Sequence, residues 1–307
     1  MPQRIPLPTA VALLLLCGIS FLAFAADPSK SIEALVEKAN EGDPQAQYQL
    51  GMAYYDGHGV QQNLETGFAW FQKAGSQNFP EAQFVLARCF FYGRGTEKDQ
   101  VSAVQWYYKA ALQGHAEAQY TLAFCYERGK GIAKNHSEAI AWYEKAGRQG
   151  MQGAVFSVAR LREKGDSSVR NPSAAFQGYM TVAKQGDGNA QYLVGKFYED
   201  GFGVEHDQSR AISWYKKAAE NKSELAAYRL GLIYLNGIGV ERDTLEAYDW
   251  MSLASVFVEN DPQAKEIFTQ LKASISPEQL KARENGVTRF RKQYSIDAQN
   301  FKEDFGY

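Results

Sequence analysis

The chain has 307 residues, of which 45% are hydrophobic and 22% are charged, and its formal net charge at neutral pH is −2. This length allows a large core or an array of repeats, and the composition is that of an ordinary soluble protein. The small net charge gives no reason to expect nucleic acid or an anionic membrane surface as a partner, and we expect neither.

Residues 1–25 are predicted to be a secretory signal peptide. Arg4 supplies the positive charge, an apolar run extends from Val11 to Phe24, and Ala23 and Ala25 fit the small-x-small rule for cleavage. We therefore expect cleavage after Ala25 and a periplasmic or secreted protein that is not integral to a membrane. The alternative is an uncleaved N-terminal anchor, although the run is short for a spanning helix.

Residues 26–42 match only the closing half of the unit that follows, so we expect one helix that caps the array. From residue 43 to 258 several residue types recur every 36 positions. A small residue opens the first helix, a Gly-x-Gly follows that helix, and a tryptophan lies in the second helix. The three sets are Ala46, Ala82, Ala118, Ala154, Ala190 and Ala226; Gly57/Gly59, Gly93/Gly95, Gly129/Gly131, Gly201/Gly203 and Gly237/Gly239; and Trp70, Trp106, Trp142, Trp214 and Trp250. The predicted repeats are 43–80, 81–116, 117–152, 153–188, 189–224 and 225–258.

The pattern resembles the Sel-1-like repeat, a relative of the tetratricopeptide repeat. In the first repeat it stands as AQYQLGMAYYDGHGV followed by FAWFQKA. The resemblance implies an all-α, right-handed α/α superhelical solenoid of about six helix-turn-helix repeats with helical caps. It also implies an adaptor surface that binds other proteins.

The fourth repeat is degenerate. It has Gly178 in place of the tryptophan, Ser167 in place of the second turn glycine, and Arg162 in place of an aromatic residue. Losing a buried tryptophan removes a large amount of packing. Two hypotheses follow: sequence drift with local repacking, or a hinge or change of curvature at this repeat.

Residues 259–294 are predicted to form C-terminal capping helices, and residues 295–307 a loose tail. Asp261 to Ala273 has an amphipathic pattern, and Ser276-Pro277-Glu278-Gln279 is typical of a helix start with Ser276 as the N-cap.

Cys89 and Cys125 stand one period apart, in a column that is otherwise apolar. Equivalent positions on packed helices lie too far apart for a disulfide. We therefore expect two buried, reduced thiols.

No metal site, cofactor or catalytic residue is predicted, because the four histidines lack ligand spacing and no nucleotide-binding or nucleophile motif occurs. One Ser-x-x-Lys, from Ser213 to Lys216, matches a motif of penicillin-recognising enzymes. Some cysteine-rich secreted members of the resembled family are described as β-lactam-binding or β-lactam-hydrolysing, so this activity is the first alternative. The chain lacks the companion Ser-Asp-Asn and Lys-Thr-Gly motifs and the paired cysteines of those members.

By analogy with tetratricopeptide repeats, the first helices are expected to line a concave groove and to expose variable columns of residues. The candidate partner-binding residues are Tyr55, Arg88, Phe91, Tyr92, Phe124, Glu127, Arg128, Arg160 and Lys196. We predict a non-enzymatic adaptor of the bacterial cell envelope that binds a protein or peptide there. The alternative for the aromatic residues is packing between repeats, and for the charged residues a solvated face. A further alternative is a peptidoglycan or glycan binder that uses the aromatic rings for stacking.

Overall fold

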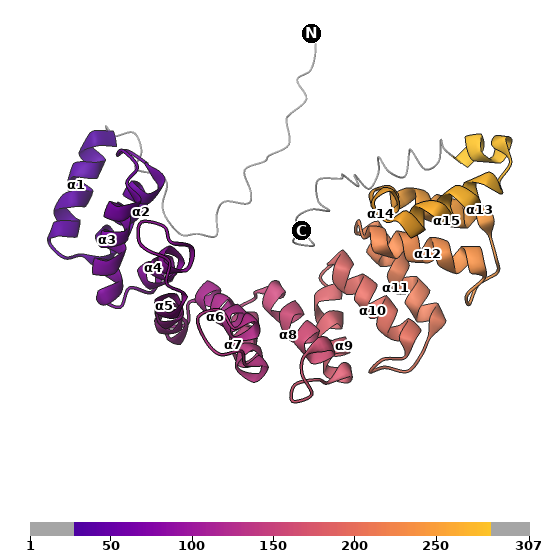
Figure 1. The fold of residues 1–307 in the computed structure, drawn as a ribbon, viewed down its shortest axis with the longest axis horizontal. Coiled ribbons are helices and arrows are strands. Elements are labelled where there is room, and N and C mark those ends of the chain that lie inside the picture. Colours follow the sequence, from indigo (N-terminus) through magenta and orange to yellow (C-terminus); the bar gives the residue numbers. More distant parts are fainter. Residues whose placement is uncertain (1–27, 284–307) are drawn as a thin grey trace, which may run out of the picture. The chain divides into compact units, whose positions relative to one another are not determined.

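The computed structural model describes residues 28–283, which contain helices and no strand. The predicted signal peptide and tail lie outside these residues, as does the end of the C-terminal capping segment. The contacts divide the chain into two compact units, Met1–His115 and Ala116–Tyr307. Each unit is a tandem array of helix pairs, which confirms the all-α solenoid of about six repeats (Figure 1).

The first unit contains α1 to α5, and the second contains α6 to α15. The helices are α1 (Pro28–Asn40), α2 (Pro44–Asp56), α3 (Leu64–Ser76), α4 (Pro80–Tyr92), α5 (Gln100–Leu112), α6 (Ala116–Arg128), α7 (His136–Arg148), α8 (Gln152–Lys164), α9 (Pro172–Ala183), α10 (Gly188–Asp200), α11 (Gln208–Glu220), α12 (Glu224–Asn236), α13 (Thr244–Leu253), α14 (Ser255–Asn260) and α15 (Pro262–Ala273). Six pairs, from α2/α3 to α12/α13, form the repeats, and in Figure 1 the two helices of each pair lie side by side.

Small residues let the two helices of a repeat approach closely. The alanine that opens each first helix is almost completely buried in all six repeats. A Cβ atom at Gly51 would lie 2.6 Å from the Phe71 ring, and one at Gly195 would lie 2.7 Å from the Tyr215 ring. Gly51 and Gly195 are therefore small because the second helix of the repeat passes directly against the first helix there.

The Gly-x-Gly turns end the first helices, and the second glycine also joins neighbouring repeats. Both glycines are left-handed in the five repeats that have them, a conformation that is costly for other residues. A Cβ atom at Gly203 would lie 2.4 Å from the Pro172 backbone. One at Gly95 would lie 2.2 Å from the Leu64 carbonyl oxygen. The turn therefore packs against the start of the preceding repeat's second helix.

Repeat 4 makes this junction differently. Gly165 is extended, with φ −66° and ψ 179°, instead of left-handed. Ser167 occupies the position of the second turn glycine. It follows His136, the first residue of α7, by as many residues as Gly203 follows Pro172, the first residue of α9. Here the Asp166 carboxylate lies 2.6 Å from His136 Nδ1, and Ser168 donates to that carboxylate. A polar side-chain contact thus replaces close backbone packing.

The missing tryptophan of repeat 4 also has a local explanation. A Cβ atom at Gly178 would lie 2.8 Å from the Cβ of Ala159 on α8. The two helices pack so closely at this point that a larger side chain would force them apart. This geometry supports the hypothesis of drift with local repacking.

Buried glutamines connect consecutive second helices, a role that their positions in the sequence did not predict. Gln83 is fully buried, donates to the Gly75 carbonyl at 3.0 Å and accepts from Gln113 at 2.8 Å. The first contact adds a second donor to a carbonyl in the last turn of α3, which also accepts from the Asn78 N–H. Gln47 and Gln191 make equivalent contacts with Ala39 and Ala183.

The C-terminal helices agree with the predicted starts, apart from α14, which was not predicted. Asp261 caps α15, where its side chain accepts from the Ala264 N–H. Ser276 and Gln279 exchange hydrogen bonds of 3.3 Å in a capping box, and a helix then runs from residue 277 to 283, where the described residues end.

Cys89 and Cys125 are both fully buried and free, which confirms that prediction. Burial raises the pKa of the Cys89 thiol to about 11 and that of the Cys125 thiol to about 12. Neither thiol therefore has appreciable thiolate character at neutral pH.

Candidate functional site

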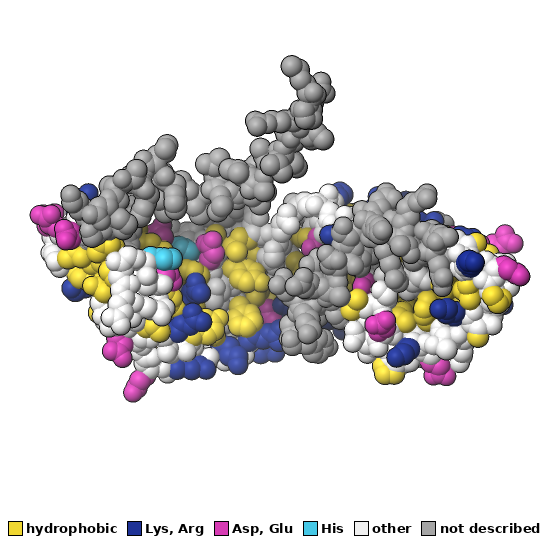
Figure 2. Space-filling model, turned by 90° about the horizontal axis from the view of Figure 1, so that it is seen from above, with side chains coloured by type: hydrophobic (Ala, Val, Ile, Leu, Met, Phe, Trp, Pro, Cys, Tyr) yellow, Lys and Arg dark blue, Asp and Glu magenta, His cyan; other side chains and the backbone are white. Residues whose placement is uncertain are grey.

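Four of the nine candidate residues are exposed on first helices. Arg88 and Tyr92 lie on α4, Arg128 on α6 and Lys196 on α10. Tyr92 is 61% exposed, which is unusual for a large aromatic side chain. Figure 2 looks onto a face of the molecule where hydrophobic side chains lie beside groups of Lys and Arg side chains. These four residues remain available to a partner.

The other aromatic candidates are half-buried, and their rings contact the second helix of their own repeat or a neighbouring arginine. The Tyr55 ring centroid lies 5.9 Å from that of Phe71, and Phe91 lies 6.3 Å from Tyr107. Phe124 lies under the Arg128 guanidinium at 6.0 Å. Packing therefore accounts for part of this aromatic column. The ring contacts of Tyr55 and Phe91 lie within a repeat, whereas the Tyr55 hydroxyl accepts a hydrogen bond of 3.1 Å from Arg94 of the next repeat.

The expectation that Glu127 is an exposed groove residue is wrong, because its side chain is only 4% exposed. It accepts a hydrogen bond of 3.1 Å from the Tyr143 hydroxyl on α7 and one of 2.8 Å from Arg160 on α8. Arg128 Nε lies 3.2 Å away. Burial, followed by the charge of Glu127, raises the pKa of Tyr143, so this hydroxyl stays protonated and donates. Glu127 and Arg160 thus bind each other across two repeats.

The same pairing recurs with a spacing of 16 residues. Tyr179 donates to Glu163 and Tyr215 donates to Glu199, each at 2.7 Å. In the remaining repeats both positions are apolar or aromatic, and the pairs are Tyr55 with Phe71, Phe91 with Tyr107, and Leu235 with Met251. Two columns that change together along the array could have revealed these pairs, whereas each column alone resembles a variable surface.

Replacing Glu199 by Gln is expected to remove an acid-dependent part of the stability. Burial alone would raise the pKa of Glu199, but hydrogen bonds from Arg229 and Tyr215 outweigh it and hold the pKa below its usual value. The carboxylate therefore stabilises the fold above the pKa of an unfolded glutamate, about 4.3, and this contribution is lost as the pH falls through the lower pKa of the folded protein. Glu199→Gln should cost about 2 kcal/mol at neutral pH and progressively less in acid.

Urea unfolding at several pH values between neutral and about 3 would measure this difference. Glu205→Gln, which changes an exposed carboxylate in the loop before α11, is the matched control. A constant difference between Glu199→Gln and the wild type at every pH would contradict the assignment.

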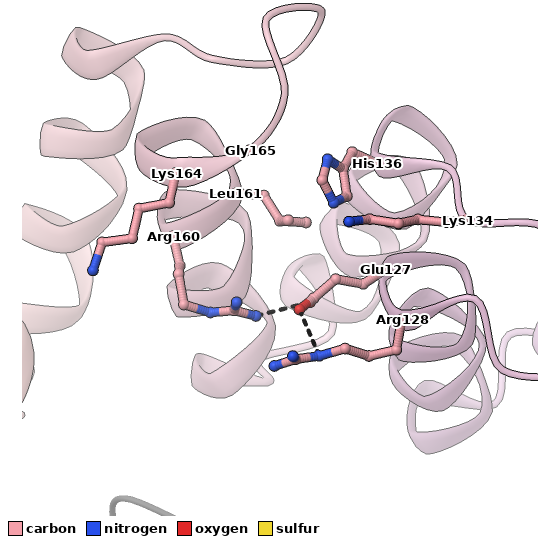
Figure 3. A pocket seen from close by; sticks show the side chains of 8 residues that line it. All are labelled: Glu127, Arg128, Lys134, His136, Arg160, Leu161, Lys164 and Gly165. Carbon is pink, nitrogen blue, oxygen red and sulfur yellow. Dashed lines mark hydrogen bonds and ion pairs between the residues drawn. The ribbon is translucent and has the colours of Figure 1, made fainter.

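A pocket of about 400 Å³ lies where repeats 3 and 4 meet (Figure 3). Its lining residues are Glu127, Arg128, Lys134, His136, Arg160, Leu161, Lys164 and Gly165. In Figure 3, Arg128 and Arg160 both reach Glu127, Lys134 lies beside His136, and Lys164 points away from them. Basic side chains dominate the walls.

The Ser-x-x-Lys motif lies on α11. Ser213 is exposed on α11, and the Lys216 ammonium lies 5.6 Å from the centre of the Tyr234 ring. Within residues 28–283, no His, Cys, Asp and Glu side chains come together in a group of three or more that could hold a metal ion. No helix in this part of the chain combines the length and hydrophobicity of a membrane span.

Comparisons with known proteins identify the repeat. The profile of the Sel1 repeat matches residues 44–79, 80–115, 116–151, 188–223 and 225–255, and it passes over the degenerate fourth repeat. A Sel1 repeat protein from Oxalobacter formigenes is 33% identical over 74% of this chain and 93% of its own, with a TM-score of 0.65. No curated protein matches the chain.

A protective antigen present in uropathogenic Escherichia coli strains is 30% identical and displays the same repeat fold, with a TM-score of 0.68. The similarity covers 91% of this chain but 60% of the antigen, so this chain spans less than two thirds of the antigen's length.

Proposed function

Because the chain belongs to the Sel1 repeat family, we propose that it is a non-enzymatic interaction protein that binds a protein or peptide partner through its first helices. The observation that carries the proposal is the set of exposed candidates on these helices, Arg88, Tyr92, Arg128 and Lys196. Aromatic and arginine side chains are the types most enriched among residues that dominate binding energy. The scaffold does not need these four side chains for its core.

We further propose that the protein works in the bacterial cell envelope or outside the cell. The apolar run from Val11 to Phe24, which follows Arg4, and the cleavage pattern that ends at Ala25 support export. The similar protein from uropathogenic Escherichia coli is a protective antigen, and accessibility to antibodies is consistent with such a location.

Crosslinking in the native envelope, followed by mass spectrometry, would test the proposal. We expect the triple variant Arg88→Ala/Tyr92→Ala/Lys196→Ala to lose most of the partners that the wild type captures. All three side chains are exposed, so the fold should survive with changes of about 0.5 kcal/mol or less for each substitution.

The matched control removes the same residue types from second helices and their ends, as Tyr108→Ala/Arg148→Ala/Lys184→Ala, at three exposed positions. It should capture the same partners as the wild type. If the first triple variant captured them equally well, the assignment to the first helices would fail.

A further inference from the structure

The pocket between repeats 3 and 4 arises where the repeat pattern changes. In repeats 2 and 5 the second turn glycine packs directly on the backbone of the preceding second helix. In repeat 4 the turn begins with an extended Gly165 and carries Ser167 in place of that glycine. Its link to the preceding helix is the pair of Asp166 and His136. The pocket lies beside this altered junction, with His136 and Gly165 among its walls.

The charge of the pocket is positive although a carboxylate lies inside it. Arg128, Lys134, Arg160 and Lys164 line it, and Glu127 is its one acidic lining residue among the described residues. Glu127 is already bound to Tyr143, Arg160 and Arg128. Even if Asp166, which pairs with His136, is counted, the cations exceed the anions.

The two guanidiniums also keep donors for a ligand. Each carries five N–H groups in a planar fork that suits a carboxylate. Glu127 binds Nε of Arg128 and one terminal nitrogen of Arg160, and the other N–H groups of the two side chains make no hydrogen bond to it. This buried carboxylate holds both arginines in place, so less side-chain freedom is lost when a ligand binds. Lys134 lies beside His136 (Figure 3).

We propose that this pocket binds the carboxylate side chains of an acidic peptide segment, with Arg128, Lys134 and Arg160 as the groups that recognise it. The inference rests on the proposed function, which it deepens by giving the chemistry of one part of the partner. A volume of about 400 Å³ falls in the range of small ligand sites and suits one or two acidic side chains. Positive walls of this kind also speed the approach of an acidic partner.

Fluorescence anisotropy with a labelled hexaglutamate peptide would test the pocket on the whole protein. We expect binding that weakens as salt is added, and no binding of a hexaglutamine peptide. Arg128→Ala/Lys134→Ala should weaken hexaglutamate binding about tenfold or more, because each substitution removes a charge-assisted hydrogen bond. Both side chains are exposed, and Arg160 is left intact because it pairs with the buried Glu127.

Arg148→Ala/Lys265→Ala is the matched control, because it removes one arginine and one lysine from exposed positions outside the pocket lining. It should bind hexaglutamate like the wild type, and circular dichroism would verify that all variants are folded. Absence of hexaglutamate binding, or equal binding by the pocket variant, would overturn the inference. So would a site that inorganic phosphate occupies while hexaglutamate does not bind.

Partner capture with the same pocket variant separates this inference from the proposed function. Wild-type capture that the pocket variant retains in full would refute the pocket while leaving the proposed function intact. Failure of the wild type to capture any partner would refute the proposed function, and the hexaglutamate titration would then still decide the chemistry of the pocket.

Discussion

Replacing Glu127 by Ala is expected to lower the free energy of unfolding by about 2–3 kcal/mol. The carboxylate is buried and accepts hydrogen bonds from Tyr143 and Arg160. The side chain of Arg160 is 34% exposed, so water compensates part of its charge once the carboxylate is gone, and the loss is smaller than the cost of about 3–5 kcal/mol that is typical of a fully buried pair. Tyr143 is buried too, so its hydroxyl would lose its acceptor in a place that water reaches poorly. Chemical denaturation monitored by circular dichroism would measure the loss.

Two further variants identify the cause of this loss. Tyr143→Phe should cost about 1 kcal/mol, since it removes one hydrogen bond and keeps the ring. The double variant Glu127→Ala/Tyr143→Phe should be less destabilised than the sum of the two single changes, because the missing hydroxyl no longer needs an acceptor. Glu144→Ala, at an exposed position on α7, should change stability by about 0.5 kcal/mol or less. If the destabilisation of the double variant equalled the sum of those of Glu127→Ala and Tyr143→Phe, the direct bond between Tyr143 and Glu127 would be refuted.

Replacing Gln83 by Met is expected to cost about 2–3 kcal/mol, because methionine fills a similar volume but provides no amide. The Gly75 carbonyl would lose its side-chain donor and keep the Asn78 N–H, and Gln113 would lose its acceptor. The loss should appear in the thermal midpoint and in the denaturant midpoint.

Gln72→Met is the control for Gln83→Met, because Gln72 is exposed on α3 in the same unit. Its stability should match that of the wild type to within about 0.5 kcal/mol. Equal effects of the two substitutions would mean that the glutamine bridge between consecutive repeats contributes nothing measurable.

Periodicity predicted the parts of the fold that depend on size and apolar character alone. The alanine that opens each first helix, the left-handed turn glycines and the buried thiols all follow from one repeated pattern. The capping box at Ser276 and Gln279 was predictable for a similar reason, since the residues that form it are local in sequence.

The polar interior was not predictable in the same way. Glu127 and Gln83 belong to residue types that are usually exposed, so each suggests a surface position when its column is considered alone. Their burial depends on partners on other helices, such as the Tyr143 hydroxyl and the Gly75 carbonyl. The predicted binding site was therefore only partly right: Glu127 is buried, whereas Tyr92 and Lys196 are exposed as predicted.

The buried carboxylates favour one order of the repeats along the chain. Glu127 in repeat 3 is completed by Arg160 from repeat 4, and Glu199 in repeat 5 is completed by Arg229 from repeat 6. Each of these repeats therefore specifies its C-terminal neighbour, although the helical scaffolds are otherwise alike. An exchange or deletion of modules during recombination, or a wrongly docked repeat during folding, would leave an acidic group buried without its cation. The buried pairs of carboxylate and arginine therefore favour the native order of the repeats over any other order.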